Sequence, residues 1–161
     1  MDFFSKPYLI YADICCLNRP LDDLQQPRIK LEAEAMIFIL EQCQQQKWTL
    51  VNSDSIEFEI SRNSDSFKKE QLKTILSIAT RYLDTNDRIE TLASNLIEQG
   101  FKLNDAFHLA FSQIYHLDVF LTTDDRLLKK AKKFPNFITI KVENPVIWLM
   151  NILQEETDEA N

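Results

Sequence analysis

The chain has 161 residues and only one glycine, Gly100. A dinucleotide-binding fingerprint and a phosphate-cradling P-loop each need several glycines at fixed spacing, so the sequence excludes both. No apolar run is long enough to span a membrane, and no membrane partner is predicted. The N-terminus lacks the basic, apolar and small-residue segments of a secretory signal, so we expect no signal peptide.

Cysteine and histidine are also scarce, with three and two residues respectively. Cys15 and Cys16 are adjacent, Cys43 stands alone, and no C-x-x-C pair is present. The sequence therefore predicts neither a disulfide framework nor a zinc site. A reducing cytoplasm is the expected location.

Basic residues are outnumbered by acidic ones, 18 against 25, which gives a net charge of −7. Proteins that simply coat nucleic acid usually carry a basic face, so the overall charge argues against that class. The last residues are acidic, and we predict a flexible acidic tail over residues 154–161 after a single domain over residues 1–153.

Short apolar runs alternate with helical patterns along the chain. The strands are expected at Tyr8–Ala12, Trp48–Val51, Val119–Leu121 and Phe137–Val142. A helix capped by Ser53 is expected, with others at Arg28–Gln46, Phe67–Tyr82, Asp87–Gln99, residues 104–115, residues 124–133 and Pro145–Leu153. Strands separated by helices predict an α/β fold with a mostly parallel sheet of four to five strands flanked by helices. The long stretch between the second and third strands is predicted to be an all-helical insertion over one edge of the sheet.

Acidic side chains follow the predicted strands at the edge where open parallel sheets bind their ligands. Asp13 follows the first strand and Asp124 follows the third. Asp105 lies in the first turn of a helix, and Glu57 and Glu59 lie in the helix after the second strand. The helical pattern does not decide between the two glutamates.

Converging carboxylates repel one another unless a cation or shared protons relieve the repulsion. Oxygen ligands without cysteine or histidine suit Mg²⁺ or Mn²⁺. Taken singly, Asp105 and Asp124 are more simply explained as helix caps or partners of the helix dipole. The metal-site prediction therefore depends on the whole set of acids converging.

Four segments together resemble the PIN-domain family: "YADICCLNRPLDD" (Tyr11–Asp23), "SDSIEFEISRN" (Ser53–Asn63), "NDAFHLAFSQIYHLDVFLTTDD" (Asn104–Asp125) and "VENP" (Val142–Pro145). The resemblance covers nearly the whole chain and is strongest to small bacterial PIN proteins of the kind that include VapC-type ribonuclease toxins. It implies a single PIN-like domain that hydrolyses RNA with Mg²⁺ or Mn²⁺. An antitoxin protein and a second copy of the chain in a homodimer are the partners that it implies.

The resemblance also assigns roles to residues. Asp13, Asp105 and Asp124 become the metal ligands, and Glu59 joins them as the catalytic glutamate, with Glu57 as the alternative. Asp124 is expected to be the ligand and Asp125 the helix cap. Supporting or substrate contacts are expected from Asn18, Thr122 and Arg126. His108 is more readily explained as a packed imidazole than as a group that orients a carboxylate.

One position departs from the family pattern, because Ile14 stands where a small hydroxyl residue commonly follows the first aspartate. A lost hydrogen bond there would weaken the hold on Asp13. The alternative function is therefore a catalytically weak PIN scaffold that binds protein or RNA. A receiver-like signalling domain is disfavoured, because the paired acids and the acceptor aspartate that it needs are missing from the ends of the first two strands.

Overall fold

The computed structural model describes residues 6–160, and these form one α/β domain. Its five strands are β1 (Leu9–Ala12), β2 (Thr49–Ser53), β3 (Arg81–Leu83), β4 (Val119–Leu121) and β5 (Val142–Glu143). They form a sheet in the order β3-β2-β1-β4-β5, and every neighbouring pair is parallel. The predicted fold class is confirmed.

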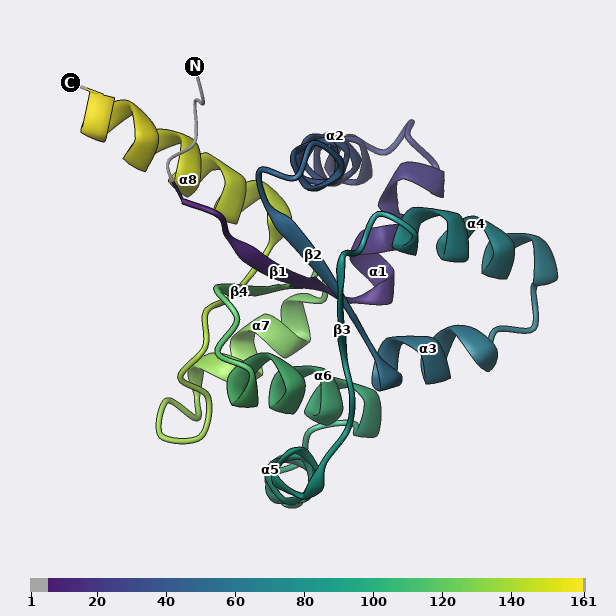
Figure 1. Ribbon diagram of the computed structural model, residues 1–161, viewed down its shortest axis with the longest axis vertical. Coiled ribbons are helices and arrows are strands. Elements are labelled where there is room, and N and C mark those ends of the chain that lie inside the picture. The colour runs from purple at the N-terminus through teal and green to yellow at the C-terminus, as the bar shows by residue number, and fades with distance from the viewer. Residues whose placement is uncertain (1–5, 161) are drawn as a thin grey trace.

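Helices cover both faces of this sheet. They are α1 (Ile14–Asn18), α2 (Pro27–Gln44), α3 (Asp54–Ser61), α4 (Ser66–Leu76), α5 (Asp87–Glu98), α6 (Leu103–Ile114), α7 (Asp125–Lys132) and α8 (Pro145–Ala160), with a 3₁₀ turn at Arg19–Leu21. Figure 1 shows α2 and α4 on one side of the sheet and α5, α6 and α7 on the other. No described helix is both long and apolar enough to cross a bilayer.

The central strand β1 explains why the sheet is covered on both faces. Ile10, Tyr11 and Ala12 are fully buried, although consecutive side chains of a strand point to opposite faces. Such continuous burial is typical of parallel sheets, whose strands are apolar on both sides. Just before β1, the Tyr8 ring contacts the rings of Trp48 and Trp148 edge-on. Trp48 also contacts Phe38 of α2, and Trp148 lies on α8, so this aromatic cluster joins both helices to the start of β1.

Two expected elements differ from the structure in the long middle segment. The helix predicted over Phe67–Tyr82 ends at Leu76, and β3 follows it. The insertion is therefore not all-helical, since β3 pairs with β2 as the edge of the sheet. A strand of three residues is too short to show the two-residue periodicity that identifies strands in a sequence.

Three further boundaries are corrected by the structure. The strand predicted over Phe137–Val142 is β5, which contains only Val142 and Glu143, because only these residues pair with β4. The segment after the first strand, for which the sequence pattern predicts a polar loop, contains α1 and the 3₁₀ turn. The closing helix runs to Ala160 rather than to Leu153. The division into a domain at 1–153 and a flexible tail at 154–161 stays a prediction.

Candidate functional site

The candidate site lies beyond the carboxyl ends of β1 and β4, which are hydrogen-bonded neighbours at the centre of the sheet. Asp13 follows β1 directly, and its backbone N–H donates to the carbonyl of Leu121 at the end of β4 (3.1 Å). Asp124 lies three residues beyond Leu121. The pairing of these two strands therefore brings together segments that are more than one hundred residues apart in sequence.

Asp13 is a buried carboxylate at the start of α1. Its Oδ1 accepts from the backbone N–H of Cys16 (3.1 Å) and from the thiol of Cys15 (2.7 Å). Burial raises the pKa of Asp13 well above its usual value, because a charge is costly away from water. Although Ile14 carries no hydroxyl, the Cys15 thiol thus supplies a hydrogen bond to Asp13.

Three of the four predicted acids line one cavity of about 560 Å³. Its lining consists of Phe58, Glu59, Arg62, Lys102, Leu103, Asn104, Asp105 and Asp124, and we call it the acidic cavity. Burial raises the pKa of Asp105, and the charges of Asp124 and Glu59 act in the same direction. Asp13 does not line this cavity.

Thr122 connects Asp13 with the acidic cavity. Its hydroxyl oxygen accepts from the backbone N–H of Asp124 (3.1 Å), and a hydrogen bond from Thr122 partly offsets the rise in the pKa of Asp13. The Thr122 side chain is fully buried, so it has one fixed set of neighbours. Among the three predicted supporting residues, Thr122 is the one that contacts two of the acids.

The structure distinguishes the two glutamates of α3. Glu59 lines the acidic cavity and accepts from the Nδ2 of Asn104 (3.1 Å). Glu57 accepts instead from the Nδ2 of Asn52 (2.6 Å) and does not line the acidic cavity. Of the two, Glu59 is therefore the one placed beside Asp105 and Asp124.

A buried chain of side chains ends at Glu59. The Ser53 hydroxyl contacts the Tyr11 hydroxyl (2.7 Å), which contacts His108 Nδ1 (2.5 Å). His108 Nε2 lies 3.5 Å from Glu59 Oε2, and neither atom has a hydrogen-bond partner among the described residues. If the Tyr11 hydroxyl donates to Nδ1, the ring carries its proton on Nε2 and directs it toward Glu59. His108 is buried as expected, but its imidazole is not fully satisfied.

The first of the two adjacent aspartates after β4, not the second, caps the helix that follows. Asp124 is the N-cap of α7, and its Oδ1 accepts from the backbone N–H groups of Arg126 (2.9 Å) and Leu127 (3.3 Å). Asp125 is the first residue of α7 and forms a bidentate pair with Arg28 (2.7 Å for each contact). The prediction that Asp125 is the cap is wrong, because the cap precedes the helix and Asp125 is already inside it.

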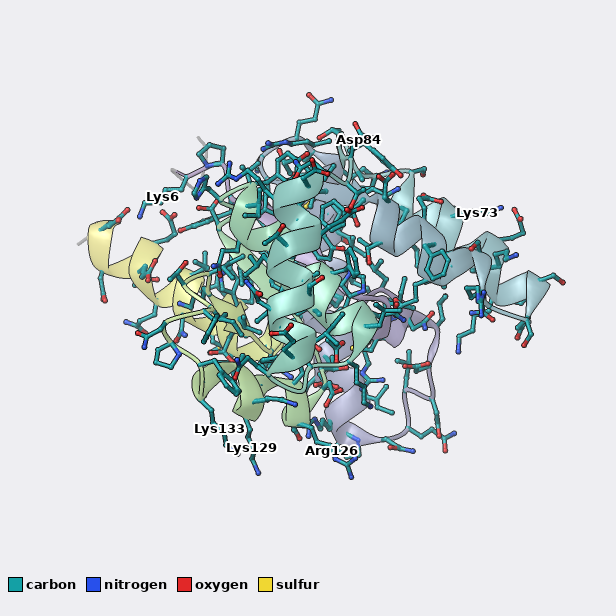
Figure 2. All side chains as sticks on the ribbon, turned by 90° about the horizontal axis from the view of Figure 1, so that it is seen from below. Lys6, Lys73, Asp84, Arg126, Lys129 and Lys133 are labelled. Atoms are coloured by element: carbon teal, nitrogen blue, oxygen red, sulfur yellow. The ribbon has the colours of Figure 1, made fainter. Side chains whose placement is uncertain are left out.

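The remaining predicted residues lie outside the acidic cavity. Asn18 is half-buried at the end of α1, and its side-chain oxygen has no hydrogen-bond partner among the described residues. Arg126 is exposed and lines a separate hollow with Lys129, Lys130 and Lys133. Figure 2 shows Arg126 and Lys129 of α7, and Lys133 directly after it, projecting from the same side of the molecule.

Sequence reasoning did not find three polar residues of the acidic cavity: Arg62, Lys102 and Asn104. Asn104 directly precedes Asp105 and Lys102 lies three residues before it, so their proximity to this acid was the only available signal. Arg62 is brought to the cavity by the turn at the end of α3. Together Arg62 and Lys102 place two cations at the edge of an otherwise acidic site.

Three comparisons relate the chain to known proteins. The family model described as "PIN domain" matches residues 50–133. A search of curated proteins found no match. Among solved structures, the chain is similar to PAE2754 from Pyrobaculum aerophilum, with a TM-score of 0.54, 16% identity, and coverage of 92% of this chain and 91% of that one.

A second similar structure is VapBC2 from Rickettsia felis bound to a DNA fragment from its promoter. Its TM-score is 0.53 at 13% identity, and the match covers 84% of this chain and 98% of that one. At these identities the two structures support the fold, whereas the family model matches more than half of the chain and includes Glu59, Asp105 and Asp124. This chain therefore belongs to the PIN-domain family.

Proposed function

We propose that the protein is a metal-dependent endoribonuclease that uses Asp13, Glu59, Asp105 and Asp124 to hydrolyse RNA phosphodiester bonds. The observation that carries the proposal is the acidic cavity. Its three acids come from different parts of the chain: Glu59 from α3, Asp105 from α6 and Asp124 from the start of α7. Such convergence is costly for the fold, as the raised pKa of Asp105 indicates. Unfavourable clustering of charge is common where a site binds a ligand.

The donor groups fit a hard divalent cation. Asp13, Asp105 and Asp124 would hold Mg²⁺ or Mn²⁺, and Glu59 contributes a buried Oε2 that has no hydrogen-bond partner among the described residues. When bound, such an ion activates water and stabilises charge on phosphoryl oxygens. A tighter group of donor atoms, Asp13 with Cys15 and Cys16, lies within 4.8 Å, but its thiols suit softer metals.

Other residues of the chain orient these acids or meet the substrate. Thr122 holds Asp13 and Asp124 in place, and Asn104 holds Glu59. Arg62 and Lys102 line the cavity and would attract a phosphodiester toward the acids. Arg126 is exposed beside Asp124 and is proposed to contact the RNA backbone outside the cavity, whereas Asn18 is proposed to support the loop after β1.

We also propose a biological setting, in which the protein is the toxin of a toxin–antitoxin pair and acts as a cytoplasmic homodimer. The similarity of its fold to VapBC2 supports this setting. A neighbouring antitoxin would cover the acidic cavity and keep the enzyme inactive.

A second candidate is a PIN scaffold with weak catalysis that binds protein or RNA. Two observations favour it: Ile14 stands at the position of the expected hydroxyl residue, and Asp13 lies outside the acidic cavity. The contact from the Cys15 thiol to Asp13 favours the nuclease instead, because it supplies a hydrogen bond that Ile14 cannot make.

The deciding experiment measures cleavage of a panel of single-stranded RNAs by the purified protein with Mn²⁺, with Mg²⁺ and with EDTA. The wild type is compared with Asp13→Asn, Asp105→Asn and the control Asp87→Asn, which changes an exposed acid in the first turn of α5. Because altering groups behind a metal ligand already costs about 10–100-fold, loss of a ligand is expected to reduce cleavage by on the order of 100-fold or more.

Cleavage that EDTA abolishes and that only the two site variants lose would support the nuclease. If RNA is bound but not cleaved under any metal condition, the scaffold is the better description. Equal cleavage by all variants would indicate a contaminating ribonuclease and would contradict the proposed roles of Asp13 and Asp105.

A further inference from the structure

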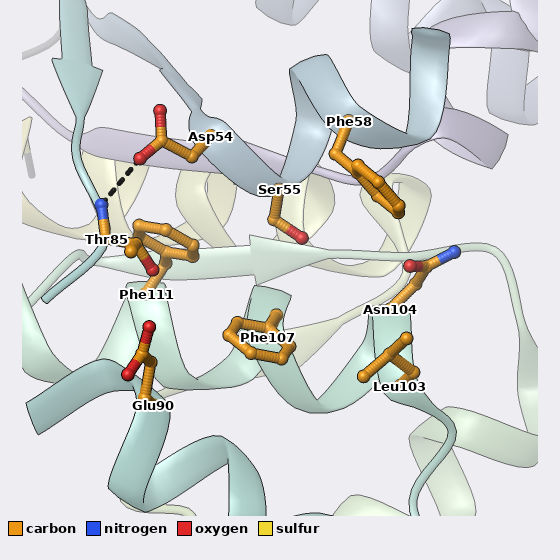
Figure 3. A pocket seen from close by; sticks show the side chains of 9 residues that line it. All are labelled: Asp54, Ser55, Phe58, Thr85, Glu90, Leu103, Asn104, Phe107 and Phe111. Carbon is orange, nitrogen blue, oxygen red and sulfur yellow. Dashed lines mark hydrogen bonds between the residues drawn. The ribbon is translucent and has the colours of Figure 1, made fainter. Parts of the chain in front are cut away.

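A second cavity, of about 370 Å³, adjoins the acidic cavity between α3 and α6. Figure 3 shows Phe58, Phe107 and Phe111 around it, and we call it the aromatic pocket. Phe58 is 52% exposed, so one of its faces is open to a ligand, whereas Phe111 is fully buried beneath the pocket. The wall exposes less polar surface than the wall of the acidic cavity does.

The two cavities share part of their walls. Three residues line both of them: Phe58, Leu103 and Asn104. Leu103 is also largely exposed, at 56%, so the boundary between the cavities is open to solvent. A ligand held at the acids can therefore extend into the aromatic pocket along one groove.

The far end of the aromatic pocket is fixed by hydrogen bonds. Asp54 Oδ1 accepts from the Tyr82 hydroxyl (2.5 Å), and Asp54 Oδ2 accepts from the backbone N–H of Thr85 (2.7 Å). These contacts tie β3 and the segment after it to the start of α3, and Figure 3 draws the bond to Thr85. A wall that is already in place loses little freedom when a ligand enters.

Two polar groups face the pocket with bonding capacity to spare. The Ser55 hydroxyl makes no hydrogen bond to the described residues and points across the pocket toward Asn104 (Figure 3). Asn104 donates through Nδ2 to Glu59, which leaves its amide oxygen on the pocket side. The Asn104 amide can therefore accept a hydrogen bond from a ligand through its oxygen while its nitrogen donates to Glu59, a proposed catalytic acid.

Charge differs between the two ends of the groove. Arg62 and Lys102 line the acidic cavity, and the Arg62 guanidinium lies 5.6 Å from the centre of the Phe58 ring. Asp54 and Glu90 line the aromatic pocket, which has no basic residue in its lining. An anionic group is therefore favoured at the boundary, and an uncharged ring with hydrogen-bond donors is favoured inside the pocket.

We propose that the aromatic pocket binds one unstacked nucleobase of single-stranded RNA, next to the phosphodiester held at the acidic cavity. The proposal rests on the proposed ribonuclease function and names the form of its substrate. Bases of single-stranded RNA stack on aromatic side chains and bond through their edges, and this pocket offers both kinds of contact. A paired base cannot enter, so the pocket selects single strands.

The test measures binding without cleavage, with EDTA present, for a short fluorescent single-stranded RNA and for copies that lack one base at each position in turn. If a base lies in the pocket, removal of the base at one position should lower the affinity more than removal at any other position. We expect the affinity to fall about tenfold there, because base stacking on an aromatic side chain contributes affinity of this order. Duplex RNA of the same sequence is expected to bind more weakly.

Variants link that position to the pocket. Phe58→Ala removes an exposed ring, and Phe107→Leu keeps apolar bulk while removing a flat aromatic face. Both variants should bind the intact RNA more weakly, and for both the removal of the sensitive base should no longer change the affinity. Phe67→Ala is the matched control, because Phe67 is 72% exposed on α4 and lies outside the pocket. Circular dichroism of each variant checks that the fold is retained.

Failure of this inference can be separated from failure of the proposed function. If metal-dependent cleavage occurs but removal of a base never matters, or if both phenylalanine variants bind like wild type, the nucleobase pocket is overturned and an apolar side chain of a protein partner becomes its better occupant. If one base matters and the variants erase that dependence, the pocket is supported even if no metal condition gives cleavage.

Discussion

Glu57 and Glu59 show how two similar residues in one helix receive different roles. Glu59 faces Asp105 and Asp124 across the acidic cavity, while Glu57 is held by Asn52. We expect Glu59→Gln to reduce RNA cleavage by roughly 10–100-fold or more, because the variant removes a carboxylate from the site.

Glu57→Gln is the matched control, with the same chemical change two residues away, and should retain wild-type cleavage. The measurement is the initial rate of RNA cleavage with saturating Mn²⁺. A larger loss in Glu57→Gln than in Glu59→Gln would mean that the other glutamate serves the site.

Asp105 carries a cost for the metal-free fold, since burial raises its pKa above the ordinary 3.8. The folded state then holds a proton more tightly than the unfolded state, so this group lowers stability as pH rises from its ordinary pKa through its raised pKa. In EDTA at neutral pH, Asp105→Asn should therefore melt a few degrees higher than wild type. For a chain of this size, each kcal/mol of added stability raises Tm by roughly 2–4 °C.

The difference should shrink as pH is lowered toward the ordinary pKa, where wild type is protonated as well. Thermal unfolding followed by circular dichroism at several pH values checks the sign, with Asp87→Asn as the control. A variant that melts lower than wild type at neutral pH would show that Asp105 stabilises the metal-free fold and would contradict the argument.

At the scale of the element, Asp124 has two roles: it is the N-cap of α7, and it is one of the proposed metal ligands. Asn is also a good N-cap, whereas Ala cannot accept from the backbone N–H groups of Arg126 and Leu127. We expect Asp124→Ala to lower the free energy of unfolding by about 1 kcal/mol, and Asp124→Asn to change it little.

Both variants should lose cleavage, because both remove the carboxylate charge. Urea unfolding measures the first effect and RNA cleavage the second. If Asp124→Asn retained cleavage while Asp124→Ala lost it, Asp124 would act only through the shape of α7.

The strands show how much of an element can be predicted from its sequence. β1, β2 and β4 were predicted because each is a short apolar run with polar residues after it. β3 was missed because its first two residues, Arg81 and Tyr82, are exposed at the sheet edge and merge with the preceding helical pattern. β5 was placed too early because its pairing with β4, rather than its own apolar residues, sets its limits.

At the scale of the whole molecule, Glu32 joins distant parts of the chain through one buried carboxylate. It accepts from Arg19 Nε (2.9 Å), Arg28 Nε (3.3 Å) and Asn144 Nδ2 (2.7 Å). Arg19 also donates to the Thr123 hydroxyl (3.1 Å), next to Asp124. The network thus anchors the loop between β4 and α7, and it gives the asparagine of "VENP" a structural role.

Removing Glu32 should be costly, because Arg19 and Asn144 would lose a buried partner. We expect Glu32→Ala to lower the free energy of unfolding by about 3–5 kcal/mol, as is typical when one partner of a buried ion pair is removed. The control is Glu34→Ala, which changes an exposed acid two residues away on α2. Urea unfolding compares the two, and equal stability would show that the network contributes nothing.

The sequence by itself determined the alternation of strands and helices and the resemblance to the PIN-domain family. It also predicted Asp13, Asp105, Asp124 and one glutamate of the helix after Ser53 as the site acids. Each of these depends on local patterns and motifs in the sequence. Only the tertiary structure placed Glu59 rather than Glu57 beside Asp105 and Asp124, made Asp124 rather than Asp125 the N-cap of α7, and brought Arg62, Lys102 and Asn104 to the acids. These features depend on which side chains meet across the sheet edge. Contacts between residues tens of positions apart are set by packing, which no local pattern encodes.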